Sequence, residues 1–440
     1  MRVRRHPDGS PGDIWDVPRS LKYYMAVTSE CGFMRSFRTL DDADVKGKRV
    51  LVRVDLNVPM QDGKVTDATR IEEIAPTINE LADKGGKVIL LSHLGRPKRP
   101  DLKYSLRPVA AEVARIVKRP VAFAEDCVGP KAEAAVAAMK NGDILCLENT
   151  RFHPEEEKND KAFAKKLATL GDIFVEEAFS AAHREHASIA AIVTASKIPA
   201  YPGRAMKAEL DALERAFEKP EHPVAAIVGG AKVSTKLNLL GHLLAKVETL
   251  MIGGGMANTF LAAQGKAIGK SLYEPDLLQT ARDILPKAKS LHREVVLPVD
   301  AVVAQKLAAH APSRVVSVDE VGAADMILDI GPRTIERVIS VLARSKTLVW
   351  NGPFGAFEFE PFDNGTIEVA EAAAELTTAG KLVSFAGGGD TVAALNAASV
   401  VGRFSHVSTA GGAFLEALEG KTLPGVKVLL LPESRSETRK

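Results

Sequence analysis

Short apolar runs that alternate with helical patterns constrain this chain more than any other feature. In the first half, the runs fall at residues 50–54, 87–91, 144–147 and 172–175. Between them, apolar residues recur at the three- and four-residue spacing of amphipathic helices. The alternation begins again with expected strands at 224–228, 249–252, 295–297, 347–350 and 382–386. Such alternation predicts parallel sheets covered by helices on both faces, so we expect an α/β fold with two doubly wound halves.

The same pattern sets the expected domain boundaries. Residues 205–223 place Met206, Leu210, Leu213 and Phe217 on one helical stripe before two prolines, which indicates a linker helix. Residues 1–36 lack apolar periodicity and do not resemble a targeting signal. We expect five segments, which are a disordered extension (1–36), a first domain (37–204), the linker helix (205–223), a second domain (224–424) and a C-terminal tail (425–440).

Composition excludes several classes of partner. The chain has 58 Lys and Arg against 56 Asp and Glu, so no global charge attracts nucleic acid or a membrane surface. Aromatic residues make up only 5%, and no apolar run approaches the ~18 residues of a membrane span. Cys31, Cys127 and Cys146 lie far apart, with no metal-binding spacing. We expect no nucleic-acid or membrane partner, neither a disulfide framework nor a cysteine zinc site, and a reducing compartment.

Polar residues in the first half gather where the expected strands end. The carboxyl ends of parallel strands form one edge of a sheet, and ligands of open α/β sheets bind there. Arg70 opens the first helix, and the segments after the strands hold Asp55, Asn57, His93, Arg96, Arg151, His153, His183, Arg184 and His186. Arginine forms paired hydrogen bonds with phosphate and carboxylate. The first half is therefore expected to bind a small polyanion.

Glycine-rich segments mark the same edge in the second half. Expected strand ends are followed by glycines at 229–230, 253–255, 387–389 and 411–412, each before a helical pattern. Backbone N–H groups at such junctions approach phosphate oxygens, and the helix dipole favours the anion. Lys232 and Lys236 are expected on one face of a helix's first turns, where a polyphosphate would offset their repulsion. Asp390, beside glycines, is a candidate Mg²⁺ ligand.

Nine motifs in order resemble the phosphoglycerate kinase family, from about residue 37 to about residue 430. They are RVDLNVP, SHLGRP, ENTRFHPEE, AFSAAHREHAS, VGGAKVSTK, IGGGMANTF, VWNGPFGAFEFEPF, GGGDT and VSTAGGAFLEALEG. The resemblance implies two Rossmann-like domains, the first for 3-phosphoglycerate and the second for Mg-nucleotide, with the chain's end returning to the first domain. It also implies a monomeric, cytoplasmic enzyme of glycolysis that converts 1,3-bisphosphoglycerate and ADP to 3-phosphoglycerate and ATP, with Mg²⁺ as cofactor.

The family's roles carry over by motif. Arg70 and Lys232 would act on the phosphoryl group in flight. The substrate would be bound by Asp55, Leu56, Asn57, Arg70, His93, Leu94, Gly95, Arg96, Arg151 and Arg184. The nucleotide would be bound by Lys236, Asn351, Glu358, Gly388, Gly389, Asp390 and Thr391, with Asp390 also on the metal. A carboxylate nucleophile is already deprotonated at neutral pH, so no general base is needed.

One departure from the family pattern falls near the arginines and histidines that follow the strand ends of the first half, which we call the basic rim. Glu176 and Glu177 stand where the family usually has Asn and Asp. The hypothesis is that one of these carboxylates competes with the substrate for Arg151 or Arg184.

Two other functions remain as alternatives. A nucleotide-dependent dehydrogenase fits the glycine-rich turns, but the G-x-G-x-x-G fingerprint is missing after the first strand of either half. A non-catalytic scaffold would keep the fold alone, and the presence of Arg70, Lys232, Lys236 and Asp390 argues against it.

Overall fold

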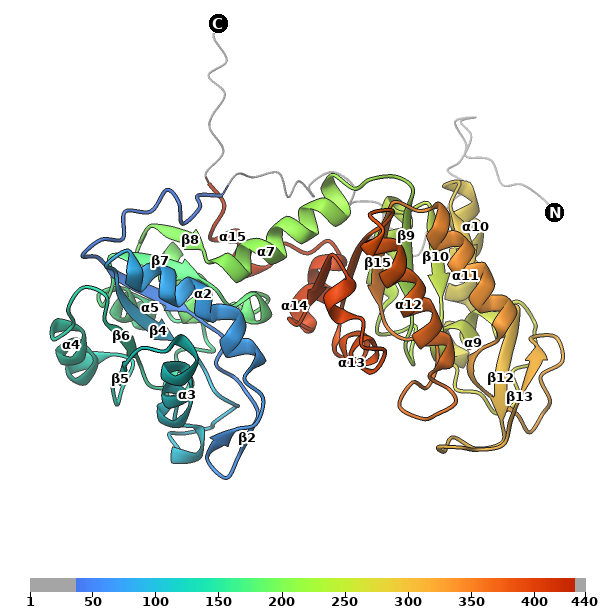
Figure 1. Ribbon diagram of the computed structural model, residues 1–440, viewed down its shortest axis with the longest axis horizontal. Coiled ribbons are helices and arrows are strands. Elements are labelled where there is room, and N and C mark those ends of the chain that lie inside the picture. Colours follow the sequence, from blue (N-terminus) through green and yellow to red (C-terminus); the bar gives the residue numbers. More distant parts are fainter. Residues whose placement is uncertain (1–36, 432–440) are drawn as a thin grey trace, which may run out of the picture. The chain divides into compact units, whose positions relative to one another are not determined.

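The computed structural model describes residues 37–431, so the expected extension 1–36 and residues 432–440 lie outside the described range. Within that range, two six-stranded sheets are parallel throughout (Figure 1). The first runs in the order β5 (Val121–Phe123), β6 (Ile144–Cys146), β4 (Lys87–Leu91), β1 (Arg49–Arg53), β7 (Ile173–Glu176) and β8 (Ala200–Pro202). The second runs β11 (Glu294–Val296), β10 (Thr249–Ile252), β9 (Val224–Val228), β15 (Thr347–Asn351), β16 (Val383–Gly387) and β17 (His406–Ser408). The expected α/β fold is confirmed.

All nine expected strands are present, each to within one residue at either end. Sequence reasoning missed β5, β8 and β17, because three residues are too few to show a period. It also missed a hairpin, β2 (Met60–Gln61) with β3 (Lys64–Val65). A further antiparallel sheet was missed as well, in the order β13 (Ser313–Ser317), β12 (Asp300–Ala304) and β14 (Met326–Ile330).

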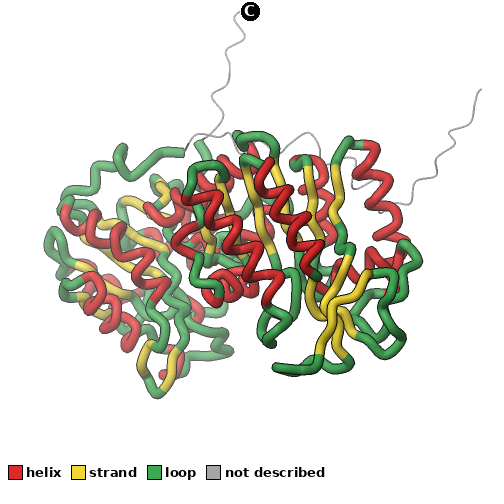
Figure 2. The backbone as a smooth tube through the Cα atoms, turned by 45° about the vertical axis from the view of Figure 1, so that its right-hand side comes forward, coloured by secondary structure: helices red, strands yellow, loops and turns green. Residues whose placement is uncertain are grey.

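Helices bury both faces of the first sheet. Alternate residues Val50 and Val52 join a core formed with α2 (Thr69–Asp83) and α3 (Arg107–Val117). Leu51 points to the other face and packs in a core with α4 (Gly129–Ala137), α5 (Lys161–Ala168) and α6 (Ile192–Thr194). Figure 2 shows these helices flanking the strands. Burial on both faces explains why the strands read as continuous apolar runs.

The second sheet has its own core. Ala225, Ile227 and Trp350 pack with apolar residues of α11 (Pro332–Arg344), α12 (Asn364–Thr378) and α13 (Gly389–Ala397). The further helices of this half are α8 (Leu237–Lys246), α9 (Gly254–Ala263), α10 (Leu278–Ser290) and α14 (Gly412–Leu418).

Each sheet has a switch point, where the chain continues from two neighbouring strands toward opposite edges of the sheet. In the first sheet this point lies between β1 and β7, and in the second between β9 and β15. At such a switch point the connections leave in opposite directions, so a crevice opens beyond the carboxyl ends of the two strands. Ligands of doubly wound sheets are therefore expected at these two places.

The expected linker helix is shorter than residues 205–223. Helix α7 spans Arg204–Leu213 and continues as one wide turn over Glu214–Glu218. Its expected apolar stripe, from Met206 to Phe217, is buried. Beyond α14, a last helix, α15 (Pro424–Lys427), contacts the first half, where the N–H of Gly425 donates to the carbonyl of Ala182 at 2.8 Å.

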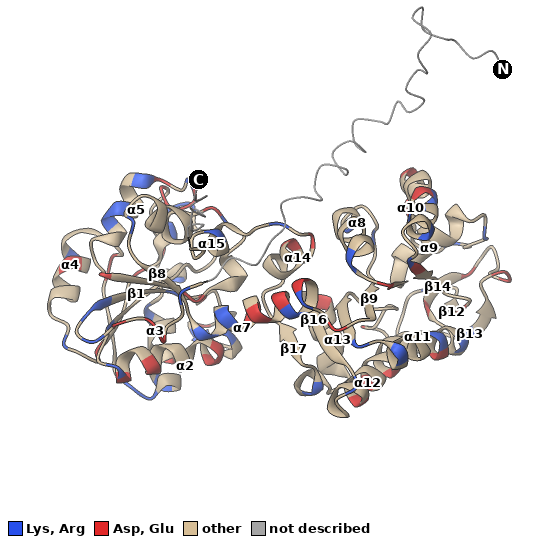
Figure 3. Ribbon diagram, turned by 90° about the horizontal axis from the view of Figure 1, so that it is seen from above, with Lys and Arg blue, Asp and Glu red and all other residues tan. Residues whose placement is uncertain are grey.

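Charge and hydropathy of the described helices agree with the composition. Acidic and basic side chains both occur on α2 and α7 (Figure 3). Among residues 37–431, each helix is too short or too polar to cross a bilayer.

Candidate functional site

The carboxylate of Asp55 is the centre of the first site, at the switch point beside β1. Its Oδ1 accepts a hydrogen bond from the N–H of Asn57 at 2.9 Å. Its Oδ2 accepts from Nη1 of Arg70 at 2.9 Å and from Oγ of Ser180. Arg70 is the second residue of α2 and also donates to the carbonyl of Asn57 at 3.0 Å. The structure joins these three expected residues in one network and adds Ser180, which sequence reasoning missed.

Arg53, the last residue of β1, fixes the orientation of His93. Its guanidinium is buried, with Nη2 3.0 Å from Nδ1 of His93 and Nε donating to Oγ of Ser188 at 3.0 Å. Arginine only donates, so Nδ1 accepts and the imidazole proton lies on Nε2. Burial and the charge of Arg53 hold the pKa of His93 well below its usual value, so the ring is neutral. Sequence reasoning missed Arg53, although a charge inside an apolar run was the available signal.

The charges of the rim arginines disfavour one another and keep the neighbouring histidines neutral. Burial and Arg184 lower the pKa of Arg151 to about 10, and burial and Arg96 lower the pKa of Arg184. Burial and Arg151 lower the pKa of His186 to about 3. Arg151 is held in place by Nη1, which donates to the carbonyl of Gly95 at 2.6 Å. Because each positive charge disfavours the next, a bound anion would stabilise the whole set.

Three expected rim residues point elsewhere. The side chains of Leu56 and Leu94 are 0% and 5% exposed and belong to the core under α2 and α3, so any ligand contact of theirs falls to the backbone. His153 lies with Nε2 2.8 Å from Oδ1 of Asp126. The sequence predicts up to four rim histidines, and His153 is not one of them.

The turn after His93 depends on Gly95. Its N–H donates to Oδ1 of Asn57 at 2.8 Å, and its φ of +63° lies in the left-handed region. A Cβ there would lie 2.5 Å from the ring of Tyr104. Glycine is thus required for the turn that presents Arg96 to the rim.

The hypothesis that Glu176 and Glu177 compete for the rim arginines is wrong. Both carboxylate oxygens of Glu177 cap α7, with Oε1 accepting from the N–H of Ala205 at 3.1 Å and Oε2 from the N–H of Met206 at 3.0 Å. Glu176 is fully buried and accepts from the N–H of Ala178 at 3.1 Å. The free N–H groups at a helix start attract a carboxylate, and α7 begins directly beside the end of β7. Glu177 therefore anchors α7, and Glu176 lies buried beside it in the chain.

Glu176 makes stability depend on pH. Burial raises its pKa to about 8, from 4.5 when exposed, so its contribution to stability is full below the unfolded pKa and is lost as the pH rises toward about 8. Glu176→Gln removes this loss, so its melting temperature should exceed the wild-type value increasingly between about pH 5 and about pH 8. Glu133→Gln, at an exposed position on α4, is the control and should follow the wild type in thermal scans. Parallel curves for Glu176→Gln and wild type would contradict the assignment.

Lys236 lies at the switch point of the second sheet. Its Nζ donates to the carbonyls of Gly229 at 2.8 Å and Asn351 at 3.1 Å, which end β9 and β15. Burial lowers its pKa to about 8. The ammonium thus lies between the two strands at the switch point, which is where ligands of doubly wound sheets bind.

The expectation that Lys232 and Lys236 share a helix's first turns is wrong. Helix α8 begins at Leu237, with Lys236 as its N-cap, and Lys232 is exposed in the turns before it. Ser234 ties that segment to Glu274, since its N–H and Oγ both donate to the carboxylate. β-Branched residues at 233 and 235 also disfavour a helix there. The loop before α8 therefore presents an exposed Lys232 and ends at a partly buried Lys236.

The glycine loops of the second half pack against one another. A Cβ on Gly229 would lie 1.9 Å from the carbonyl oxygen of Pro353, so the loops after β9 and β15 touch only because Gly229 has none. Nδ2 of Asn351 donates to the carbonyl of Gly387 at 2.8 Å. Oγ1 of Thr391 accepts from the N–H of Gly352 at 2.7 Å, which joins the loop after β15 to α13.

A pocket of about 260 Å³ lies in front of these loops. Its lining brings together Glu358, Asp390 and the start of α9 at Gly254 and Gly255. Gly388 and Gly389 begin α13, which places Asp390 in that helix's first turn. Two helix starts facing one pocket favour an anion. Sequence reasoning missed the apolar wall, formed by Leu272, Pro298, Leu307, Met326 and Phe354.

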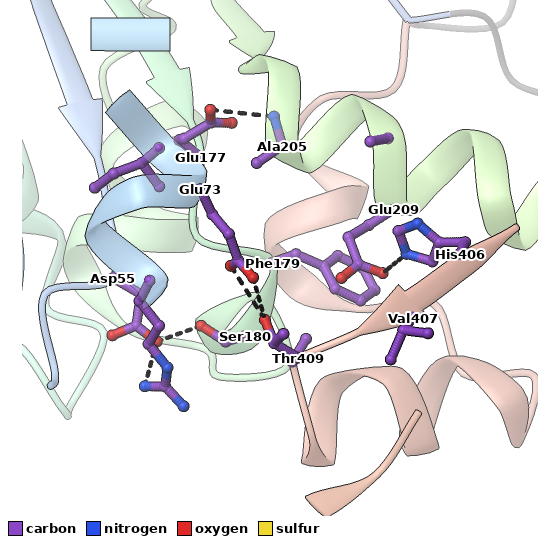
Figure 4. Close-up of a pocket in the computed structure, with 14 residues that line it drawn as sticks. Asp55, Glu73, Glu177, Phe179, Ser180, Ala205, Glu209, His406, Val407 and Thr409 are labelled. Carbon is purple, nitrogen blue, oxygen red and sulfur yellow. Dashed lines mark hydrogen bonds and ion pairs between the residues drawn. The ribbon is translucent and has the colours of Figure 1, made fainter. Parts of the chain in front are cut away.

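A second pocket, of about 190 Å³, lies between residues of the first and second halves (Figure 4). Nε2 of His406 lies 3.0 Å from Oε2 of Glu209 on α7, and Oγ of Ser408 donates to Oε1 at 2.8 Å. Oγ1 of Thr409 contacts both carboxylate oxygens of Glu73 on α2 at 3.1 Å. β17 and the loop after it are thus connected to α7 and α2 by side-chain hydrogen bonds.

Comparison with known proteins decides the family. The phosphoglycerate kinase family model matches residues 40–421. The chain belongs to the phosphoglycerate kinase family. The phosphoglycerate kinase of Bradyrhizobium diazoefficiens is 63% identical over 393 residues, which are 89% of this chain and 98% of that protein. The one from Rhodopseudomonas palustris is 63% identical over 90% of this chain and 99% of its own length.

Solved structures of phosphoglycerate kinases share the fold. The enzyme from Coxiella burnetii superimposes with a TM-score of 0.83 at 42% identity, over 90% of this chain and 98% of that one. The enzyme from Pyrococcus horikoshii gives 0.74 at 31% identity, over 89% and 98%. The resemblance read from the nine motifs is confirmed, and the activity is that of the phosphoglycerate kinase family, a phosphotransferase with a carboxyl acceptor and ATP or ADP as co-substrate.

Proposed function

We propose that this chain transfers a phosphoryl group between 1,3-bisphosphoglycerate and ADP by holding one ligand at each switch point. The observation that carries this proposal is the pairing of two different sites in one chain. A cluster of mutually repelling arginines with neutral histidines lies at the edge of the first sheet. Glycine-rich loops with a partly buried lysine lie at the second switch point. The reaction joins a phosphorylated carboxylic acid to a nucleotide, and these are the two ligands such sites suit.

The first site is proposed to bind 3-phosphoglycerate or 1,3-bisphosphoglycerate. The arginines of the rim would bind the phosphate and carboxyl ends of the substrate, and Asp55 and Asn57 would bind its hydroxyl. Support comes from the shared depression of the rim pKa values and from the network around Asp55. The proposed substrate contacts are Asp55, Asn57, Arg70, His93, Arg96, Arg151 and Arg184, with backbone contacts from Leu56, Leu94 and Gly95.

The second site is proposed to bind ATP or ADP. Lys236 and the starts of α9 and α13 would meet the phosphates, and Glu358 the ribose hydroxyls. Asn351, Gly388, Gly389 and Thr391 would shape the phosphate loop, supported by the hydrogen bonds that join β15, β16 and α13. The exposed carboxylate of Asp390 beside this pocket fits Mg²⁺, which takes oxygen ligands from one or two carboxylates and from phosphates. A bound Mg²⁺ would neutralise phosphate charge.

The chain's own groups then carry the transfer. In the direction that consumes ATP, the substrate carboxylate is the nucleophile and is already deprotonated, so no general base is required. Phosphoryl transfer is mainly positioning and charge stabilisation. Arg70 from the first half and the exposed Lys232 from the second are proposed to stabilise the phosphoryl group in flight. Because they come from different halves, the halves must close, and closure also excludes water.

The proposed domains follow from the two separate cores. Residues 37–204 form the substrate domain, 205–223 the linker, and 224–424 the nucleotide domain, supported by apolar clusters that stay within each half. The C-terminal tail is proposed to return to the first domain through its described residues 425–431, supported by the contact of Gly425 with Ala182. We further propose that the protein acts as a cytoplasmic monomer.

A coupled assay tests the proposed function. The purified protein should form ATP from 1,3-bisphosphoglycerate and ADP in the presence of Mg²⁺, and binding of NAD should be weak. If the protein forms no ATP but binds NAD tightly, the dehydrogenase alternative is favoured. Absent ATP formation with no nucleotide binding would favour the scaffold.

The partly buried Lys236 should make nucleotide affinity depend on pH. Its pKa of about 8 means that the free protein loses this charge above that pH, while a bound phosphate needs it. The dissociation constant of ADP should therefore rise above about pH 8, by up to about tenfold per pH unit. Lys236→Arg stays charged, so its ADP affinity should remain flat over the same range in calorimetric titrations. The same slope in both proteins would show that Lys236 does not meet the phosphates.

A further inference from the structure

Three metal-ligating side chains converge outside the proposed active site. Asp126 and Cys127 follow β5, and His153 follows the short helical turn Thr150–Phe152 after β6. β5 and β6 are neighbouring parallel strands, so their carboxyl ends bring the two loops together. One ligand atom from each residue lies within 4.8 Å of the others. β5 is the edge strand, and β6 and β4 separate it from the switch point at β1 and β7.

The donors are held in place before any ion binds. Oδ1 of Asp126 accepts from the N–H of Cys127 at 2.7 Å and lies 2.8 Å from Nε2 of His153. The imidazole of His153 also packs against the ring of Phe163, with centroids 5.1 Å apart. Two of the three donors are thus already oriented toward each other by contacts that do not involve a metal.

The burial of the three residues resembles that of an open metal site. Cys127 is fully buried, whereas the side chains of Asp126 and His153 are 40% and 29% exposed. An ion would therefore rest with its sulfur ligand on the protein side and one position facing solvent. Three protein ligands with an open fourth position are typical of zinc sites that keep a bound water.

We propose that Asp126, Cys127 and His153 bind one divalent ion of the zinc class. A thiolate, an imidazole and a carboxylate together match borderline-soft ions, whereas Mg²⁺ and Ca²⁺ take oxygen ligands. On binding, the thiol proton of Cys127 leaves to solvent, and the thiolate and carboxylate then offset the two charges of the ion. The site is thus distinct from the Mg²⁺ position proposed at Asp390.

The proposed ion would connect two loops of the substrate half. His153 lies two residues beyond Arg151, one of the proposed substrate arginines, and Cys127 lies two residues before the start of α4. The spacing of the cysteines along the chain does not reveal this site. Its other two ligands are the adjacent Asp126 and His153, which follows a different strand. The alternative reading is an Asp126–His153 ion pair beside a cysteine that only fills the core.

Cobalt is the probe that separates these readings. The full-length, chelator-treated protein, in a Cys31→Ser background and without nucleotide, is titrated with Co²⁺. One equivalent should produce the near-ultraviolet thiolate-to-cobalt charge-transfer band and the intense visible bands of tetrahedral cobalt, and Zn²⁺ should abolish both. Cobalt bound to oxygen ligands alone, as at Asp390, gives no thiolate band.

Matched variants assign the sulfur and its partners. Cys127→Ser should lose the charge-transfer band, whereas Cys146→Ser should keep it, because Cys146 is also buried but its Sγ faces the carbonyl of Leu147. Should Cys127→Ser fail to fold, His153→Gln and Asp126→Asn change partly exposed side chains and should each weaken cobalt binding about tenfold or more. A wild-type protein without the thiolate band, or a band that survives Cys127→Ser or both other variants, would overturn the proposal.

Discussion

Replacing Arg70 by alanine should lower kcat about a thousandfold while the affinity for 3-phosphoglycerate changes little. Arg70 lies in the first turn of α2 at the first switch point, and its side chain is about one third exposed. Its Nη1 donates to the carboxylate of Asp55 and to the carbonyl of Asn57. The rim holds further arginines that can bind the substrate, whereas a guanidinium at the reacting end mainly stabilises charge that develops in the transition state. Steady-state kinetics and calorimetry with 3-phosphoglycerate together measure the two effects.

Arg119 is the matched control for this prediction. It is also about one third exposed and also pairs with one carboxylate, that of Asp83, but it follows α3 outside the site. Arg119→Ala should therefore leave kcat unchanged and show what the loss of such an ion pair costs in melting temperature. A raised KM with unchanged kcat in Arg70→Ala would reassign Arg70 to ground-state binding.

Local patterns were enough to predict the fold. Strands buried on both faces read as apolar runs, as in 224–228, and helices between them show one apolar stripe. The strand order was not predictable in detail, because edge strands of three residues such as β5 and β17 carry too little pattern. Where α8 starts was also missed, since that depends on Ser234 bonding to Glu274, which is 40 residues away.

The candidate site could be predicted in type but not in arrangement. Charged residues and glycines after strand ends predicted an anion-binding edge, and the structure joins Asp55, Asn57 and Arg70 in one network at that edge. The pattern could not show that Arg53 orients His93 or that Glu177 caps α7, because both contacts join distant segments. Nor could it show that His153 faces Asp126 and not the rim.

A proline at Asp211 should abolish closure without destroying either ligand site. Asp211 is an exposed residue of α7, the helix whose Glu209 contacts His406 and Ser408 of β17. Proline there removes a helical hydrogen bond and clashes with the preceding turn, at about 3 kcal/mol or more locally. The residues of both ligand sites lie on other elements, so we expect kcat to fall roughly tenfold or more as the halves lose their hinge.

Asp211→Ala is the control for the helix itself. It removes the same ion pair with Lys207, at 2.6 Å, but leaves α7 intact. Its kcat should equal that of the wild type, so a loss in the proline variant alone would be due to the broken helix.

The central claim is that two sites, each complete for its own ligand, catalyse transfer only when α7 brings them together. Calorimetric affinities for 3-phosphoglycerate and for Mg·ADP, measured singly beside kcat in Asp211→Pro, test it most directly. The account predicts that both dissociation constants stay within about threefold of wild type while kcat falls roughly tenfold or more. If both affinities collapse together with kcat, α7 is part of a binding site or of a shared core, and the two-site account is contradicted.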